Sequence, residues 1–134
     1  MVHKTLVQEW VEKAEEDLGF ASKTLADPDI TYYAQICFHF QQAAEKYLKA
    51  YIVAFNLEFK KTHDLPELLR LCVEKEPELE ALANECELLT DYYIETRYPV
   101  HWPSNVSKEE AKEAQRGAIK IKEAMLKFLS PILS

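Results

Sequence analysis

The sequence predicts an all-α protein, an up-down bundle of about five helices, and three observations support this prediction. The 134 residues include only two glycines, and Ala, Leu, Glu and Lys dominate the composition. Apolar residues recur at helical spacing along most of the chain, and short links interrupt this periodicity. A chain of this length fits one domain, so we expect residues 1–134 to form a single helical domain.

Start and stop signals divide the chain into five expected helices. Asp27-Pro28 ends the first, because proline cannot continue a helix and disfavours helical backbone in the residue before it. Pro77 separates the third from the fourth. Asp64 and Ser107 each have a glutamate three residues later, the capping-box pattern of a helix start. The expected bounds are about 4–26, 31–56, 64–75, 78–95 and 108–129.

The central expected helix, around residues 35–55, is apolar around most of its circumference, which is typical of the buried centre of a bundle. Its polar exceptions recur at steps of four and three and therefore share one narrow face. We call this face the polar strip, and its members are Gln35, His39, Gln42, Lys46 and Lys49. A strip of this kind on a buried helix indicates an interface or an anionic ligand, although solvated lysines and a half-exposed histidine would explain it equally.

Three more polar residues have expected partners. Asp17 lies beside the apolar face of the first helix, so its carboxylate needs Arg97, a tyrosine or a lysine of the polar strip. Glu45 precedes Lys49 by four residues, which predicts an ion pair on the helix surface. His63 precedes a helix start, where it is expected to pack against the helix entry.

Charge and cysteine content exclude several classes of protein. The net charge of −7 argues against broad, non-specific nucleic-acid binding. Three cysteines without metal-ligand spacing are typical of buried free thiols. No glycine-rich phosphate loop, zinc-ligand spacing or nucleophile-elbow serine occurs, so we expect no metal and no cofactor. No apolar run is long enough to cross a bilayer, so we expect a cytoplasmic protein without a membrane partner.

The charge is unevenly divided along the chain. Residues 1–95 hold 9 Lys/Arg and 19 Asp/Glu, a balance of −10, whereas residues 96–134 hold 7 and 4, a balance of +3. Lys112, Arg116 and Lys120 lie four apart in the last expected helix and form a basic ridge. This ridge is either a solvated face or the footprint of an RNA or partner.

Four segments in order resemble the HEPN domain family, of the prokaryotic type often encoded beside a minimal nucleotidyltransferase. Residues 10–21 resemble the first-helix pattern W-x3-A-x2-DL-x2-A. Residues 37–50, with the core QQAAEK, resemble the central-helix signature, and His63-Asp64-Leu65 resembles the start of an H-x-L-x2-L segment. Residues 96–99, TRYP, resemble the end of the fourth helix.

The resemblance implies an all-helical fold, a homodimer and one of two kinds of function. Many HEPN proteins are metal-independent RNases, often toxins, that use an Arg-x4-6-His motif from each subunit of a dimer. Others lack a working motif and serve as nucleotide-binding or adaptor partners of a nucleotidyltransferase in toxin–antitoxin-like pairs. A plain helical scaffold is the third alternative.

Arg97 and His101 are the candidate catalytic pair. A histidine can transfer protons near neutral pH, and an arginine fork can bind a phosphate. Tyr98 and Trp102 could stack on bases. Only three residues separate Arg97 from His101, one fewer than the family motif requires, and Pro99 is one of them. Three interpretations therefore stay open: an RNase pair, an Arg97 that binds a nucleotide phosphate without catalysis, and an Arg97 paired with Asp91 or Glu95 beside an exposed His101.

Overall fold

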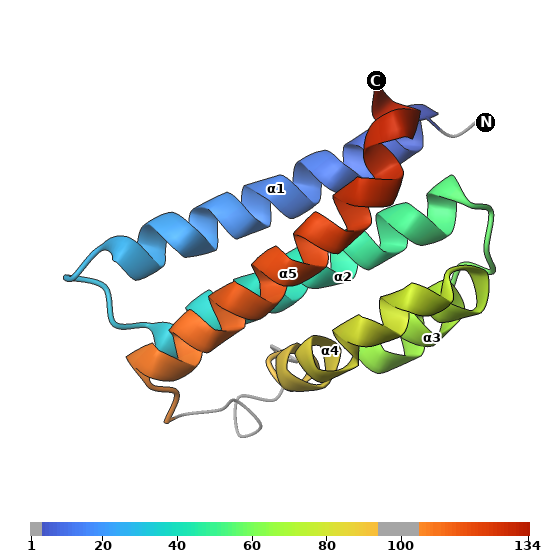
Figure 1. Ribbon diagram of the computed structural model, residues 1–134. Helices are drawn as coiled ribbons and strands as arrows, with labels where there is room; N and C mark the ends of the chain where they lie inside the picture. The colour runs from blue at the N-terminus through green and yellow to red at the C-terminus, as the bar shows by residue number, and fades with distance from the viewer. Residues whose placement is uncertain (1–3, 94–104) are drawn as a thin grey trace.

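The computed structural model describes residues 4–93 and 105–134, and within these residues the chain forms helices and no strand. The elements are α1 (Lys4–Ala26), α2 (Tyr33–Ala54), α3 (Leu65–Lys75), the 3₁₀ helix η1 (Pro77–Leu82), α4 (Ala83–Thr90) and α5 (Lys108–Leu133). Figure 1 shows α1, α2 and α5 as three long helices, with α3, η1 and α4 along one flank of α2 and α5. The predicted all-α bundle of five helices is confirmed.

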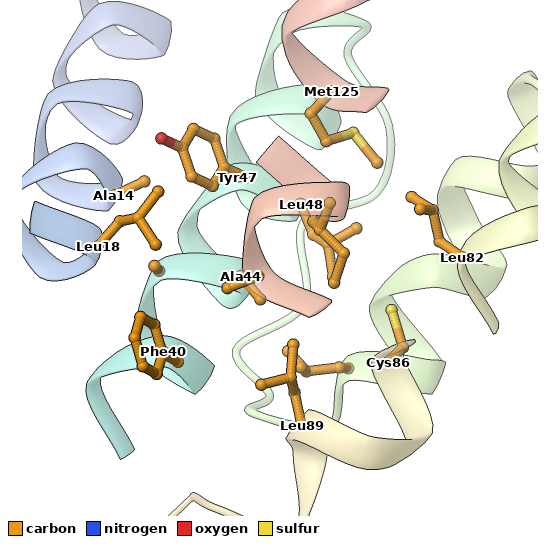
Figure 2. Close-up of a cluster of buried hydrophobic side chains, with 14 of the residues drawn as sticks. Ala14, Leu18, Phe40, Ala44, Tyr47, Leu48, Leu82, Cys86, Leu89 and Met125 are labelled. Atoms are coloured by element: carbon orange, nitrogen blue, oxygen red, sulfur yellow. The ribbon is translucent and has the colours of Figure 1, made fainter. Parts of the chain in front are cut away.

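The centre of the bundle is α2, as its apolar circumference predicts. It contacts α1, α3, α4 and α5. Its largest buried side chains include Phe40, Tyr47 and Tyr51, and Figure 2 shows Phe40 and Tyr47 among neighbours from α1, α5 and the α3–α4 flank. In the described part of the chain, no helix is both long enough and apolar enough to cross a membrane.

Small residues let α5 approach its neighbours closely. Its buried face begins with Ala111, Ala114, Gly117 and Ala118 and continues with larger side chains such as Met125. A Cβ built on Gly117 would lie 3.5 Å from Cδ1 of Leu89 on α4, at ordinary van der Waals contact. Because these positions carry so little volume, α5 lies close against both α2 and α4.

The helix ends follow the expected signals within a few residues. The Asp64 side chain accepts a hydrogen bond from the Glu67 N–H at 3.1 Å, and Ser107 with Glu110 forms the complete capping box. α2 ends at Ala54, before Asn56, whose φ of 58° lies in the left-handed region that asparagine tolerates. α5 runs four residues past its expected end, because Pro131 falls in the last turn, where its missing N–H removes only one hydrogen bond.

The expected fourth helix is the one element that the structure changes in kind. It is divided into η1 and α4, which ends at Thr90 instead of continuing through residue 93 toward Glu95. The division follows the spacing of the buried side chains, because Leu79 and Leu82 are three residues apart and share one face of a 3₁₀ helix. The Thr90 hydroxyl accepts a hydrogen bond from the Leu65 N–H at 3.0 Å, which ties the end of α4 to the start of α3.

Replacing Leu48 of α2 by alanine should lower the free energy of unfolding by about 2–5 kcal/mol, because a cavity is left in a close-packed interior. Leu48 is completely buried between α2 and its neighbours. Urea denaturation followed by circular dichroism measures the change. Leu6→Ala is the matched control, since Leu6 is 43% exposed and its loss should cost less than about 1 kcal/mol. Equal losses in the two variants would contradict this account of the core.

The three cysteines should not react with a thiol reagent at pH 8 until the protein unfolds. Burial raises the pKa of Cys37, Cys72 and Cys86 from the ordinary 9.0 to about 12, so the reactive thiolate is scarce in the folded state. Labelling with a colourimetric disulfide reagent, with and without urea, measures this difference. Below pH 9 both states hold neutral thiols; between pH 9 and 12 only the unfolded chain ionises, so these thiols lower stability as the pH rises. Rapid labelling of the folded protein at pH 8 would contradict the prediction.

Candidate functional site

The structure divides the polar strip of α2 between two carboxylates. Gln35 is exposed, His39, Gln42 and Lys46 are half-buried, and Lys49 is buried. His39 and Lys46 contact Asp17, whereas Gln42 and Lys49 contact Glu45. We call these two sets the Asp17 group and the Glu45 group.

The Asp17 group joins α1 to α2. Lys46 Nζ donates a hydrogen bond of 2.6 Å to Asp17 Oδ2, and Nδ1 of His39 lies 3.4 Å from Asp17 Oδ1. This contact confirms the expectation that Asp17 pairs with a lysine of the strip. The side chain of Lys46 is 25% exposed and that of His39 33%, so this group lies at the rim of the protein rather than inside it.

The Glu45 group is buried, and this corrects the expected surface pair. Lys49 Nζ donates to Glu45 Oε2 at 2.8 Å as the spacing predicts, but Glu45 is 4% exposed and Lys49 6%. The aromatic rings of Trp10 and Phe59 cover Lys49, with ring centroids 5.9 and 5.7 Å from its ammonium. The error has a physical reason: the i,i+4 spacing fixes which side chains meet, but the covering rings come from α1 and from the link after α2.

Hydrogen bonds saturate the Glu45 carboxylate. Gln41 Nε2 donates to Glu45 Oε1 and to the His63 carbonyl, each at 3.2 Å. Gln42 Nε2 donates to Gln41 Oε1 at 2.8 Å and lies 3.4 Å from Glu45 Oε1. His63 Nδ1 lies 3.0 Å from each Glu45 oxygen. Buried charge is stable only with partners of this number and geometry, so the group holds the link before α3 onto α2.

His63 connects this group to the end of α4. It stands immediately before Asp64, the N-cap of α3, which confirms its expected place at the helix entry. Its ring also stacks on Tyr93, with centroids 3.9 Å apart and planes 11° from parallel. The contacts of His63 with Glu45 and Tyr93 were missed by sequence reasoning, since three separate elements supply them. The one signal in the sequence is that Glu45 and His63 both fall in segments that resemble the family pattern, and this signal does not pair them.

Aromatic rings bridge the two groups. Phe20 and Phe38 both pack edge-on against His39, with centroids 4.9 and 5.3 Å away. Phe38 also lies 6.2 Å from Tyr93. A row of rings therefore leads from Phe20, which is 56% exposed, across α2 to His63. Tyr93 lies between Phe38 and His63 in this row, and in the sequence it stands four residues before Arg97.

Four of the candidate residues cannot be placed in this geometry. Arg97, Tyr98, His101 and Trp102 lie outside the described residues. Within residues 4–93 and 105–134, no cluster of three or more His, Cys, Asp or Glu side chains could hold a metal ion. The described histidines each face a carboxylate through Nδ1, an arrangement that fixes the orientation of an imidazole ring.

Comparison with known proteins agrees with the fold. Among curated protein sequences, none is significantly similar to the chain. The crystal structure of TT1696 from Thermus thermophilus superimposes with a TM-score of 0.78 at 32% identity, covering 95% of this chain and 98% of that one. ST0689, an archaeal HEPN homologue, superimposes with a TM-score of 0.70 at 24% identity, covering 92% and 97% of the two chains. Residues 7–129 match the HEPN domain, and the chain belongs to the HEPN family.

Proposed function

We propose that this HEPN protein acts in the cytoplasm as the nucleotide- or RNA-associated partner of a minimal nucleotidyltransferase, in a toxin–antitoxin-like pair. In this proposal the protein is a homodimer, and its binding residues are His39, Gln42, Lys46, Lys49, Tyr98 and Trp102. The proposal assigns the chain a binding role rather than a catalytic one.

One observation favours binding over catalysis: the described cations of the strip are already matched. Lys46 is paired with Asp17, and Lys49 with Glu45. His39 and His63 each face one of the same two carboxylates. A cleavage site needs a base and a cation that are free to engage the substrate phosphate. These four side chains instead stabilise each other and form a fixed polar surface beside the ring row.

The short Arg97–His101 spacing supports the same proposal. Three residues separate the two side chains, and Pro99 is among them. Proline disfavours helical backbone in the residue before it, here Tyr98, and a four-residue separation places two side chains on one face only within a helix.

The proposal predicts that a minimal nucleotidyltransferase is encoded beside this protein and that the two proteins form a stable complex. The two proteins, expressed together with one affinity tag, should elute from gel filtration as one species. Lys46→Gln should weaken the complex, because it removes the lysine that neutralises Asp17 at the partly exposed rim and leaves this carboxylate only its 3.4 Å contact with His39 among the described residues. Lys13→Gln is the control with the same change of charge, since Lys13 is 65% exposed on α1 and, among the described residues, forms an ion pair only with Glu16. Separate elution of the two wild-type proteins would overturn the proposal.

The alternative function is a metal-independent endoribonuclease that uses Arg97 and His101. One observation favours it: both residue types of the family motif occur in the expected order after α4. This alternative predicts RNA cleavage that persists in EDTA and falls by about 10²-fold or more in His101→Ala and in Arg97→Ala.

A cleavage assay with purified protein decides between the two functions. Under the binding proposal the protein alone cleaves little RNA, and the two alanine variants do not differ from wild type. EDTA-resistant cleavage that both substitutions abolish would establish the nuclease and remove the non-catalytic assignment. A protein that neither binds the nucleotidyltransferase nor cleaves RNA would be the plain helical scaffold.

A further inference from the structure

A basic hollow lies where the C-terminal end of α1 meets the N-terminal end of α5. Its volume is about 300 Å³, and Lys108, Lys112 and Arg116 of α5 line it together with Ser22 of α1. The three cationic residues follow each other at steps of four, so they project from the same face of α5. Gln115 Nε2 donates to the Ser22 hydroxyl at 3.1 Å, which joins the two helices beside these cations.

Two of the three cations of the hollow form no ion pair with a described residue, unlike the other lysines of the same helix. Lys120, Lys122 and Lys127 lie 3.0, 3.3 and 2.9 Å from carboxylates of Glu85, Glu15 and Glu78. Among the described residues, Lys112 forms an ion pair only with Glu109, at 3.7 Å, and the Glu109 side chain is 80% exposed. In the described part of the chain, Lys108 and Arg116 form no ion pair, and no carboxylate lines the hollow. A protein with a net charge of −7 therefore keeps an unpaired positive concavity at this place.

Local helix energetics do not account for Lys108, whereas Lys112 has its i,i+3 pair with Glu109. Lys108 is the first residue of α5, at the positive end of the helix dipole, where a cation is unfavourable. The C-terminal carbonyls of α1 could attract the same side chains, which is a structural alternative. That alternative predicts a loss of stability on substitution, whereas a ligand site predicts a loss of binding.

We propose that the basic hollow binds a run of phosphate groups, and this inference rests on the proposed association with a nucleotide or RNA. At a rise of 1.5 Å per residue, Lys108 and Arg116 are separated by about 12 Å along the helix axis. A single phosphate contacts all three cations only where their long side chains converge on it, and it cannot extend along a row of that length. The triphosphate of a nucleotide or successive phosphodiesters of single-stranded RNA can, and the guanidinium fork of Arg116 suits paired hydrogen bonds to phosphate oxygens.

The hollow is tested with a triple variant, Lys108→Gln, Lys112→Gln and Arg116→Gln, at low salt. Its charge-matched control is Lys13→Gln, Lys61→Gln and Lys127→Gln, because these three lysines are exposed and lie outside the hollow. The probes are ATP, inorganic triphosphate and a fluorescein-labelled oligouridine, with affinity measured by anisotropy or calorimetry. We expect the hollow variant to bind about tenfold or more weakly, and the control to stay within about twofold of wild type.

Salt titration identifies the source of the phosphates. If RNA is the ligand, log K should fall with log salt at a slope of about −2, since three phosphate contacts contribute about −0.7 each, and the hollow variant should lose most of this slope. Binding of ATP and triphosphate without RNA would support the hollow with a free nucleotide as its ligand. Equal losses in the hollow variant and its control would overturn the proposal, as would wild-type protein that binds none of the probes.

Two further readouts keep the outcomes separate. Thermal unfolding of the hollow variant tests the structural alternative: a lowered Tm with unchanged binding would assign the cations to the end of α1 and overturn the proposal. Gel filtration with the nucleotidyltransferase tests the proposed function by itself. A normal complex without phosphate binding would reject the proposed phosphate site and leave the proposed function standing. Phosphate binding without a complex would reject the proposed partnership and leave the phosphate site standing.

Discussion

Glu45 lies in the middle of the central helix α2 and is only 4% exposed. A buried carboxylate is stable only when charged and hydrogen-bonding partners are held around it. Moving one ion out of water costs several kcal/mol, and removing one partner of a buried pair costs about 3–5 kcal/mol. Lys49 supplies the opposite charge from the same helix, whereas Gln41 and His63 supply hydrogen-bonding groups. His63 belongs to the link before α3, so the buried carboxylate dictates where that link lies. His63 in turn stacks on Tyr93, and this contact fixes the position of the described residues that follow α4.

The need of each buried or half-buried carboxylate for a cation determines what Lys46 and Lys49 of the polar strip do. Lys49 is needed to neutralise Glu45, and Lys46 to neutralise Asp17, so neither ammonium is free for a phosphate while its pair persists. A ligand at the strip must therefore either replace a pair or bind the polar surface that the pairs create. The first route leaves a carboxylate without its cation, which is unfavourable in proportion to its burial. The Asp17 group, at the rim, is the less costly of the two to open, and Glu45 the more costly. Under the proposed function, a ligand could therefore open the Asp17 group, whereas the Glu45 group with Gln42 and Lys49 would offer it a fixed polar surface.

The fold was largely readable from the sequence because its signals are local. Proline after Asp27, the Ser107–Glu110 capping box and the all-round apolar α2 each depend on residues within a turn or two of one another. Pairings within one helix, such as Glu45 with Lys49, were readable for the same reason. Burial of that pair was not, because the covering rings of Trp10 and Phe59 come from other elements. The stacking of His63 on Tyr93 joins residues thirty positions apart, and no periodicity encodes such a contact.

The charge division along the chain acquires a physical meaning from α5. The N-terminal 95 residues carry a balance of −10 and the remainder +3, and α5 holds most of the later cations. Toward its C-terminal half, α5 forms ion pairs with carboxylates of three other elements: Lys120 with α4, Lys122 with α1 and Lys127 with η1. Toward its N-terminal half, Lys108 and Arg116 have no such carboxylate among the described residues. Each exposed ion pair contributes little to stability, so the protein loses little by leaving the cations at the N-terminal end of α5 unpaired. The positive potential of those cations therefore remains. One amphipathic helix thus neutralises carboxylates of the bundle with its C-terminal half and keeps unpaired cations in its N-terminal half, where the proposed phosphate site lies.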